Sequence, residues 1–169
     1  MKTMVRAFTI GAAALTLALS SGAASAQAPP APAADPTSFA SAADVQAQLR
    51  QMLAEMRPDQ GFMWRPLVRD GANVAAIEIW KKPGRPAVHP DQAEYAIVLE
   101  GAGTLLSGGV MADPKVSNPT LVEGSRIDGG VTRPLAPGDV ILVPAGVPHW
   151  FGITGERLVL LGIKLPAGK

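Results

Sequence analysis

The chain is 169 residues long, which is enough for one domain that buries a core of its own. It has no cysteine, so disulfide bonds, thiolate chemistry and a lipid-modified cysteine are excluded. With 15 basic and 14 acidic residues its formal net charge is +1, and this balance gives no reason to expect a nucleic acid or an anionic membrane as a partner.

Residues 1–26 have the three parts of a secretory signal peptide. Lys2 and Arg6 provide a positive start, residues 8–19 are apolar but too few to span a membrane, and residues 24–26 (Ala-Ser-Ala) form a cleavage site. Cleavage removes two of the 15 basic residues and leaves 13 against 14 acidic ones, a net charge of −1. We therefore expect a periplasmic or secreted protein that has no membrane attachment after cleavage.

Two segments precede the main domain. Residues 27–40 are rich in Ala and Pro and predict a linker. Residues 41–58 predict an amphipathic helix, in which Ser41 and Asp44 form a capping-box-like start and Pro58 ends the run. Apolar residues recur in it at helical spacing: Val45, Leu49, Met52, Leu53 and Met56. We expect this apolar stripe to pack on the outside of the main domain, with partner binding as the less favoured alternative.

Residues 59–169 predict one β-domain, because short apolar runs alternate there with Gly- and Pro-containing turns. Asp70-Gly71 is typical of a tight hairpin turn, and residues 101–103 (Gly-Ala-Gly) predict a corner. Residues 112–132 contain few apolar side chains and predict a loop-rich excursion with one or two short strands, which could cover the domain as a lid. Strands are predicted at residues 74–80, 94–99, 104–106, 140–143 and 158–163. This pattern favours an antiparallel sandwich or small barrel.

The only two histidines stand beside predicted strands. His89 lies in the loop before residues 94–99, and His149 follows the turn after residues 140–143. Two strand-edge histidines with a carboxylate nearby predict a metal site. Neutral imidazole and carboxylate suit Fe(II), Mn, Ni, Cu or Zn, and two histidines with one carboxylate are the usual facial set of non-haem iron oxygenases.

Two groups of residues stand at characteristic spacings. The first is Gly138, Pro144, Gly146 and His149, and the second is Glu94 and Gly101. Both match sequence motifs of the cupin family, and from about residue 77 to 163 the chain resembles a small single-domain cupin. Ile153 stands where the family has Asn. The resemblance implies an all-β fold, a cupin-type double-sheet jelly-roll barrel, here with one N-terminal amphipathic helix.

The resemblance also implies a metal ion inside the barrel, held by His89, Glu94 and His149. Asp91 is implied either as a fourth ligand or as a base beside the metal, and Gln92 is a weaker candidate for the fourth ligand. The family motif that contains Glu94 and Gly101 normally has two histidines before its glutamate. Counting back from Glu94 puts His89 in the second place, whereas counting forward from Gly84 puts it near the first place and Asp91 in the second.

Period-two alternation assigns the side chains of these strands to faces. If Glu94 points into the barrel, Tyr95 points out, and His149 and Phe151 point in while Trp150 points out. Trp64 and Trp80 are interpreted as packing residues.

The function implied by the resemblance is that of a metal-dependent enzyme acting on a small organic molecule. Oxygenase, isomerase and lyase chemistry all occur on this fold, which does not choose among them. The alternative is a non-catalytic cupin that binds a small ligand or metal, including a barrel whose site has degenerated. A homodimer is also expected, through the apolar outer faces of the strands that carry Tyr95 and Trp150.

Overall fold

The computed structural model describes residues 34–167, so the predicted signal peptide of residues 1–26 lies outside the described residues, as does the first half of the predicted linker. Residues 34–40 have no regular secondary structure. Within the described range, no helix is long and apolar enough to cross a membrane.

The described chain contains one helix, α1 (Ala42–Glu55), and eleven strands. The strands are β1 (Phe62–Asp70), β2 (Asn73–Trp80), β3 (Ala87–Val88), β4 (Gln92–Ser107), β5 (Val110–Ala112), β6 (Lys115–Asn118), β7 (Leu121–Glu123), β8 (Arg126–Asp128), β9 (Val131–Leu135), β10 (Val140–Val143) and β11 (His149–Pro166). The predicted all-β class with one N-terminal helix is confirmed.

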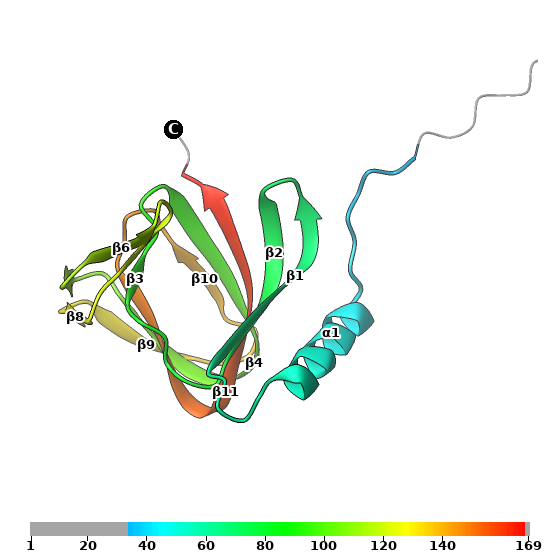
Figure 1. The fold of residues 1–169 in the computed structure, drawn as a ribbon, viewed down its shortest axis with the longest axis horizontal. Coiled ribbons are helices and arrows are strands. Elements are labelled where there is room, and N and C mark those ends of the chain that lie inside the picture. The colour runs from blue at the N-terminus through cyan, green and yellow to red at the C-terminus, as the bar shows by residue number, and fades with distance from the viewer. Residues whose placement is uncertain (1–33, 168–169) are drawn as a thin grey trace, which may run out of the picture. The chain divides into compact units, whose positions relative to one another are not determined.

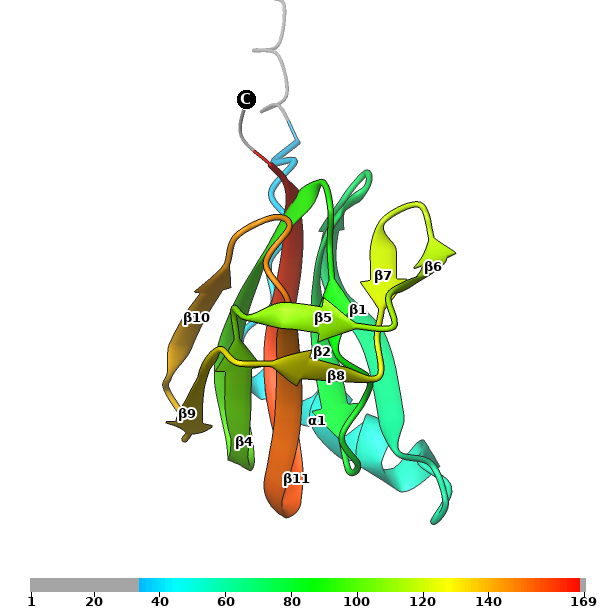
Figure 2. The same cartoon turned by 90° about the vertical axis from the view of Figure 1, so that its left-hand side faces the viewer.

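Nine of the strands form one antiparallel sheet that curls on itself into a barrel, as Figure 1 shows. β11 lies between β2 and β4, and β9 and β10 both pair with β4. β5 and β8 make a separate two-stranded sheet, which crosses the side of the barrel in Figure 2. The expected double-sheet jelly roll is therefore present, and long strands that continue from one half into the other join its two halves.

The predicted capping box begins α1. The Asp44 N–H donates to Ser41 Oγ at 3.2 Å, and the Ser41 N–H donates to Asp44 Oδ2 at 2.8 Å, so two otherwise unpaired amides are satisfied. The predicted hairpin between β1 and β2 is also present. It closes at the pair Asp70–Asn73, with Gly71 at φ 55°.

Helix α1 covers the outer face of this hairpin (Figure 1). Leu49 and Met52, the most deeply buried residues of α1, pack on a sheet face formed by Ile77, Ile79 and Val159. A second cluster fills the barrel interior and consists of Ala96, Val98, Leu105, Leu135, Ile141, Val143, Phe151, Leu158 and Leu160. The hairpin thus has its outer face buried by α1, which leaves its inner face for the barrel.

The predicted corner at residues 101–103 is present as a bend inside β4, which continues through it instead of ending there. The β4–β11 ladder pairs Ile153 with Gly103 and Leu158 with Gly101, so four residues of β11 are looped out between the two pairs. Gly101 has φ 85°. An added Cβ there would clash with the Arg157 carbonyl. A bulge of this kind bends a strand without ending its pairing.

The excursion contains more strand than predicted. β6, β7 and β8 all lie within residues 112–132, where one or two short strands were expected. All four residues of β6 are exposed, so the segment shows no apolar alternation from which a strand could be recognised.

We predict that Leu49→Ala lowers the free energy of unfolding by about 2–5 kcal/mol, because it opens a cavity between α1 and the hairpin. Urea unfolding followed by far-ultraviolet circular dichroism measures the change. Arg50→Ala, at the neighbouring exposed position, serves as the control and should stay within about 0.5 kcal/mol of the wild type. Equal effects of the two substitutions would contradict the packing of α1 on the hairpin.

Candidate metal centre

Backbone pairing brings the two histidines to one place. His149 is the first residue of β11 and pairs with Ala87 of β3, which puts His89 just beyond the end of β3 nearby. The Gly146 N–H donates to the His89 carbonyl at 2.9 Å, so the turn before β11 is attached to the backbone of His89. The short strand β3 and this turn therefore fix the separation of the two rings.

Glu94 reaches the histidines because the β4–β11 ladder folds back across the barrel. Glu94 pairs with Lys164 at one end of the ladder, and His149 pairs with Ser107 at the other end. The bend near Gly101 makes the two halves of the ladder face each other. Glu94 and His149, which are far apart along the ladder, consequently meet across the interior.

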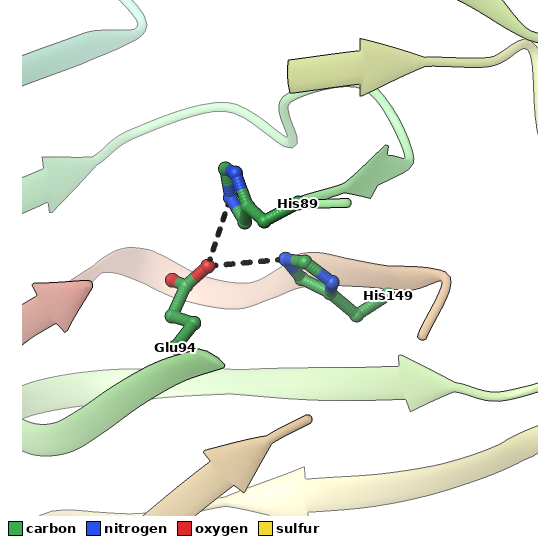
Figure 3. Close-up of side chains that lie close together, drawn as sticks. All are labelled: His89, Glu94 and His149. Atoms are coloured by element: carbon green, nitrogen blue, oxygen red, sulfur yellow. Dashed lines mark ion pairs between the residues drawn. The ribbon is translucent and has the colours of Figure 1, made fainter. Parts of the chain in front are cut away.

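The three predicted ligands converge, as Figure 3 shows. Glu94 Oε2 lies 3.2 Å from His89 Nε2 and 3.2 Å from His149 Nε2. The three side chains are buried, with 9%, 3% and 3% of their surface exposed for His89, Glu94 and His149. One ligand atom from each lies within 4.8 Å of the other two, close enough for a single ion to bind all three.

Backbone carbonyls determine which ring nitrogens face the centre. His89 Nδ1 lies 2.9 Å from the Thr120 carbonyl, and His149 Nδ1 lies 3.1 Å from the Val147 carbonyl. A carbonyl only accepts hydrogen bonds, so each Nδ1 carries the hydrogen and a neutral ring presents the Nε2 lone pair to the centre. Metal-binding histidines characteristically have this outer hydrogen bond.

These assignments leave three electron-pair donors around one point. Without a metal ion, hydrogen bonds from both rings to Glu94 require two imidazolium cations whose ring centroids are only 5.5 Å apart. A single metal ion satisfies the same three atoms without that repulsion. The residues therefore fit a metal ion, and their donor set matches the Fe, Mn, Ni, Cu or Zn ion expected from the sequence.

Glu94 is a carboxylate in this setting. Burial raises the pKa of its carboxyl group, but in the metal-free site hydrogen bonds donated by His149 and His89 in their protonated forms, together with the charge on Lys164, lower that pKa to below its usual range. Lys164 Nζ lies 3.7 Å from Glu94 Oε2. The ligand that carries the negative charge is thus ionised before any metal binds.

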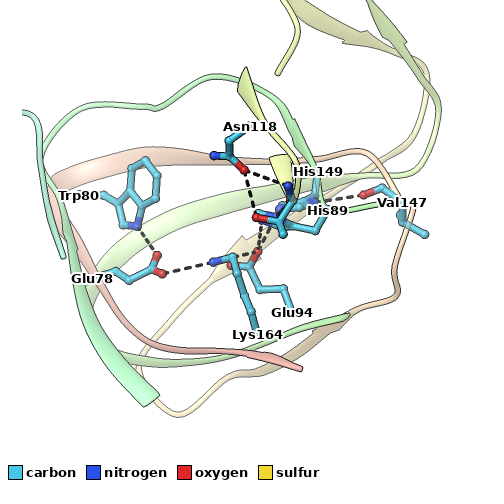
Figure 4. A network of polar contacts seen from close by, with 9 residues as sticks. Glu78, Trp80, His89, Glu94, Asn118, Val147, His149 and Lys164 are labelled. Carbon is cyan, nitrogen blue, oxygen red and sulfur yellow. Dashed lines mark hydrogen bonds and ion pairs between the residues drawn. The ribbon is translucent and has the colours of Figure 1, made fainter. Parts of the chain in front are cut away.

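A second buried carboxylate adjoins the centre (Figure 4). Glu78 Oε1 lies 3.7 Å from the same Lys164 Nζ, and the Trp80 indole donates to Glu78 Oε2 at 3.1 Å. Burial raises the Glu78 pKa and the charge on Glu94 adds to this, while Lys164 and Trp80 oppose it in part. Gly162 leaves room for this carboxylate, because a Cβ there would lie 2.7 Å from Glu78 Oε1.

The three ligands line a cavity of about 920 Å³, which is large enough for a small organic molecule. Its other walls come from the hairpin, from the loop around Gly84 and from the excursion, which contributes Asn118, Thr120, Leu121 and Glu123. The excursion therefore covers the site, in line with the lid expected from the sequence.

The structure does not bring the predicted Asp91 to the centre. Asp91 is exposed in the turn before β4, and its carbonyl accepts a hydrogen bond from the Ala167 N–H at 2.9 Å. It lies three residues from Glu94, an odd spacing that places the two side chains on opposite sides of an extended chain. Gln92 is half-buried and, like Asp91, is absent from the residues that line the cavity.

Sequence reasoning missed Glu78 and Lys164. Alternation in residues 74–80 could have revealed Glu78, because its neighbours Ile77 and Ile79 point to the opposite, buried face. Lys164 gave no such signal, since a lysine near the end of a strand is normally solvated. Trp64 and Trp80, interpreted as packing residues, both line the cavity.

Residues 84–165 match the family model described as cupin. The barrel is a cupin fold. The curated proteins include none that matches the chain.

Several solved structures are similar to this chain at low sequence identity. They include a protein from Thermus thermophilus (18% identity, covering 70% of this chain and 95% of that chain, TM-score 0.49). They also include a predicted oxalate decarboxylase from Thermotoga maritima (17% identity, covering 62% of this chain and 80% of that chain, TM-score 0.46). Another is KdgF from a Halomonas species (16% identity, covering 64% of this chain and 84% of that chain, TM-score 0.45).

We predict that Gly101→Ala lowers both stability and metal affinity, because the bend that brings Glu94 to His149 needs a positive φ and no side chain. The cost in free energy of unfolding should be at least about 1–3 kcal/mol. Gly155→Ala is the matched control on the same bend, where an added Cβ would come no closer than 3.8 Å to its nearest neighbour, Ala102. Urea unfolding and metal titration of both variants test this, and a Gly101→Ala variant as stable as Gly155→Ala would contradict it.

Proposed function

We propose that this cupin binds one divalent transition metal through His89, Glu94 and His149 and is an enzyme acting on a small organic molecule. One observation carries the proposal: three electron-pair donors converge in a buried site, and backbone carbonyls hold both histidines with Nε2 directed at the carboxylate. The bound metal would supply Lewis-acid or oxygen-activating chemistry, in an oxygenase, isomerase or lyase reaction.

The chain's own residues prepare the site for such chemistry. Three protein ligands leave positions free for substrate, as catalytic metal sites require. The Thr120 and Val147 carbonyls hold the two rings, and aromatic side chains form part of the wall of the cavity beside them. The buried Glu78 and the half-buried Lys164 add an acidic and a basic side chain at the cavity wall, next to the metal ligands.

Two further parts of the proposal rest on the sequence and on the outer surface. Residues 1–26 support export to the periplasm or beyond. The outer face of β4 and β10 supports a homodimer, because Tyr95, Val140 and Leu142 are 40%, 75% and 54% exposed. Trp150 is half-buried, and its indole donates to the Gly84 carbonyl at 2.9 Å, so the dimer proposal rests on the β4–β10 face alone.

We predict that protein purified without a polyhistidine tag takes up about one equivalent of metal, and that Glu94→Gln weakens binding at least about 100-fold. The glutamine keeps the shape of the side chain but removes the charge that the metal requires. Elemental analysis and calorimetric titration with Mn²⁺, Fe²⁺, Ni²⁺, Cu²⁺ and Zn²⁺ measure the effect.

Asp91→Asn is the control, because it removes a carboxylate that the structure places outside the centre; its metal affinity should equal that of the wild type. Far-ultraviolet circular dichroism should show that both variants remain folded. If the wild type takes up none of the five metals, or if Glu94→Gln binds them as tightly as the wild type does, the proposed function is wrong.

A further inference from the structure

The cavity beside the metal ligands has one aromatic wall, formed by the inner face of the β1–β2 hairpin. Phe62 pairs with Trp80 across the two strands, with ring centroids 4.2 Å apart, and Trp64 pairs with Glu78. All three of these aromatic side chains line the cavity. The third tryptophan of the chain, Trp150, lines it as well.

The wall is held in place from three sides. Trp80 donates its indole N–H to the buried Glu78 (Figure 4), and its ring packs so closely on Gly84 that a Cβ there would lie 2.5 Å from the ring. From behind, α1 packs on Met63 and Ile79, the residues that point to the outer face. Aromatic surface fixed in this way binds a partner ring with little loss of conformational entropy.

The mouth of the wall still exposes apolar surface. Phe62 is 40% exposed and Trp64 is 46% exposed, although both line the cavity. A row of rings leads from Phe62 and Trp80 to the metal centre. The ring centroids of Trp80 and Phe151 are 6.4 Å apart, and those of Phe151 and the metal ligand His149 are 6.0 Å apart. A planar molecule lying along this row would bury the exposed rings and reach the metal centre.

The charges at the inner end favour an anionic group. Lys164 offsets Glu78, and Glu94 offsets one of the two charges of a divalent ion, so one positive charge remains when the metal proposed above is bound. Arg85 and Glu123 also line the cavity and add one charge of each sign. A carboxylate at the inner end would therefore meet both the metal and the Lys164 ammonium group.

We propose that the ligand of this cavity is an aromatic carboxylate, with its ring on Phe62, Trp64 and Trp80 and its acid group directed to the metal and Lys164. The preference for the acid rests on the proposed metal binding, whereas the preference for the ring rests on the hairpin alone. The two parts can therefore be tested separately in one set of measurements.

Calorimetric titration with three matched probes tests the proposal on metal-loaded protein: 3-phenylpropanoate, 3-cyclohexylpropanoate and 3-phenylpropanamide. Because stacking adds to simple burial, the phenyl acid should bind about three- to tenfold more tightly than the cyclohexyl acid. It should also bind about tenfold or more tightly than the neutral amide. Tryptophan fluorescence, excited where the phenyl ring does not absorb, should change on binding.

Variants locate the binding surface. Trp64→Leu and Phe62→Leu should weaken 3-phenylpropanoate about three- to tenfold and remove its advantage over the cyclohexyl acid, while metal content stays unchanged. Tyr95→Leu is the matched control: Tyr95 is 40% exposed, as Phe62 is, but lies outside the cavity lining, and its substitution should have no effect.

Metal content, measured in every sample, separates the two proposals. A metal-loaded wild type that binds the cyclohexyl acid as tightly as the phenyl acid, or the amide as tightly as the acid, overturns the present proposal and leaves the proposed function intact. A Tyr95→Leu effect equal to that of Trp64→Leu also overturns it. Protein that takes up no metal overturns the proposed function, and the preference for a carboxylate over the amide then falls with it.

Discussion

The bend in the β4–β11 ladder is the constraint on which the site depends. The two strands pair from Ser107 and His149 at one end to Gln92 and Pro166 at the other, with a register shift between them beside Gly101, which has φ 85°. Folded at this point, the ladder closes the barrel and sets Glu94 against His149. The positive φ of Gly101 thus helps to bring together Glu94 and His149, whose side chains are distant in the ladder.

The same fold explains why Glu78 and Lys164 lie beside the metal ligands. Lys164 pairs with Glu94 on the neighbouring strand, and β11 also pairs with β2, which carries Glu78 and Trp80. A continuous set of polar contacts therefore runs from Trp80 through Glu78 and Lys164 to Glu94. Helix α1 lies on the other side of the hairpin, so its packing supports the aromatic wall as well as the fold.

The sequence predicted those features that depend on local pattern. The capping box, the Asp70–Asn73 hairpin and the strand before His149 follow from residue types at short spacing, and the motif spacings pointed to His89, Glu94 and His149. Asp91 was implied because counting forward from Gly84 puts it in the second histidine place of the family motif, but its side chain is exposed in the turn before β4 and does not line the cavity. The alternative register of that motif was therefore misleading there.

The remaining features arise from closure of the barrel and could not be read locally. Lys164 and Glu78 lie 86 residues apart and meet only because β2 and β4 flank β11. The predicted corner at residues 101–103 became a bend because partner strands continue to pair on both sides of it. The row of rings likewise unites β1, β2 and β11, which no single segment reveals.

The proposed metal centre requires that both histidines carry their hydrogen on Nδ1 and offer Nε2 to one metal ion. Nitrogen-15 nuclear magnetic resonance of the imidazole rings tests it most directly, because the chain has only two histidines, His89 and His149, and each gives one pair of ring-nitrogen signals. We expect one equivalent of Zn²⁺ to shift both Nε2 resonances together and to leave both Nδ1 nitrogens protonated. Nε2 signals that do not respond to metal, or a response from one ring alone, would contradict it.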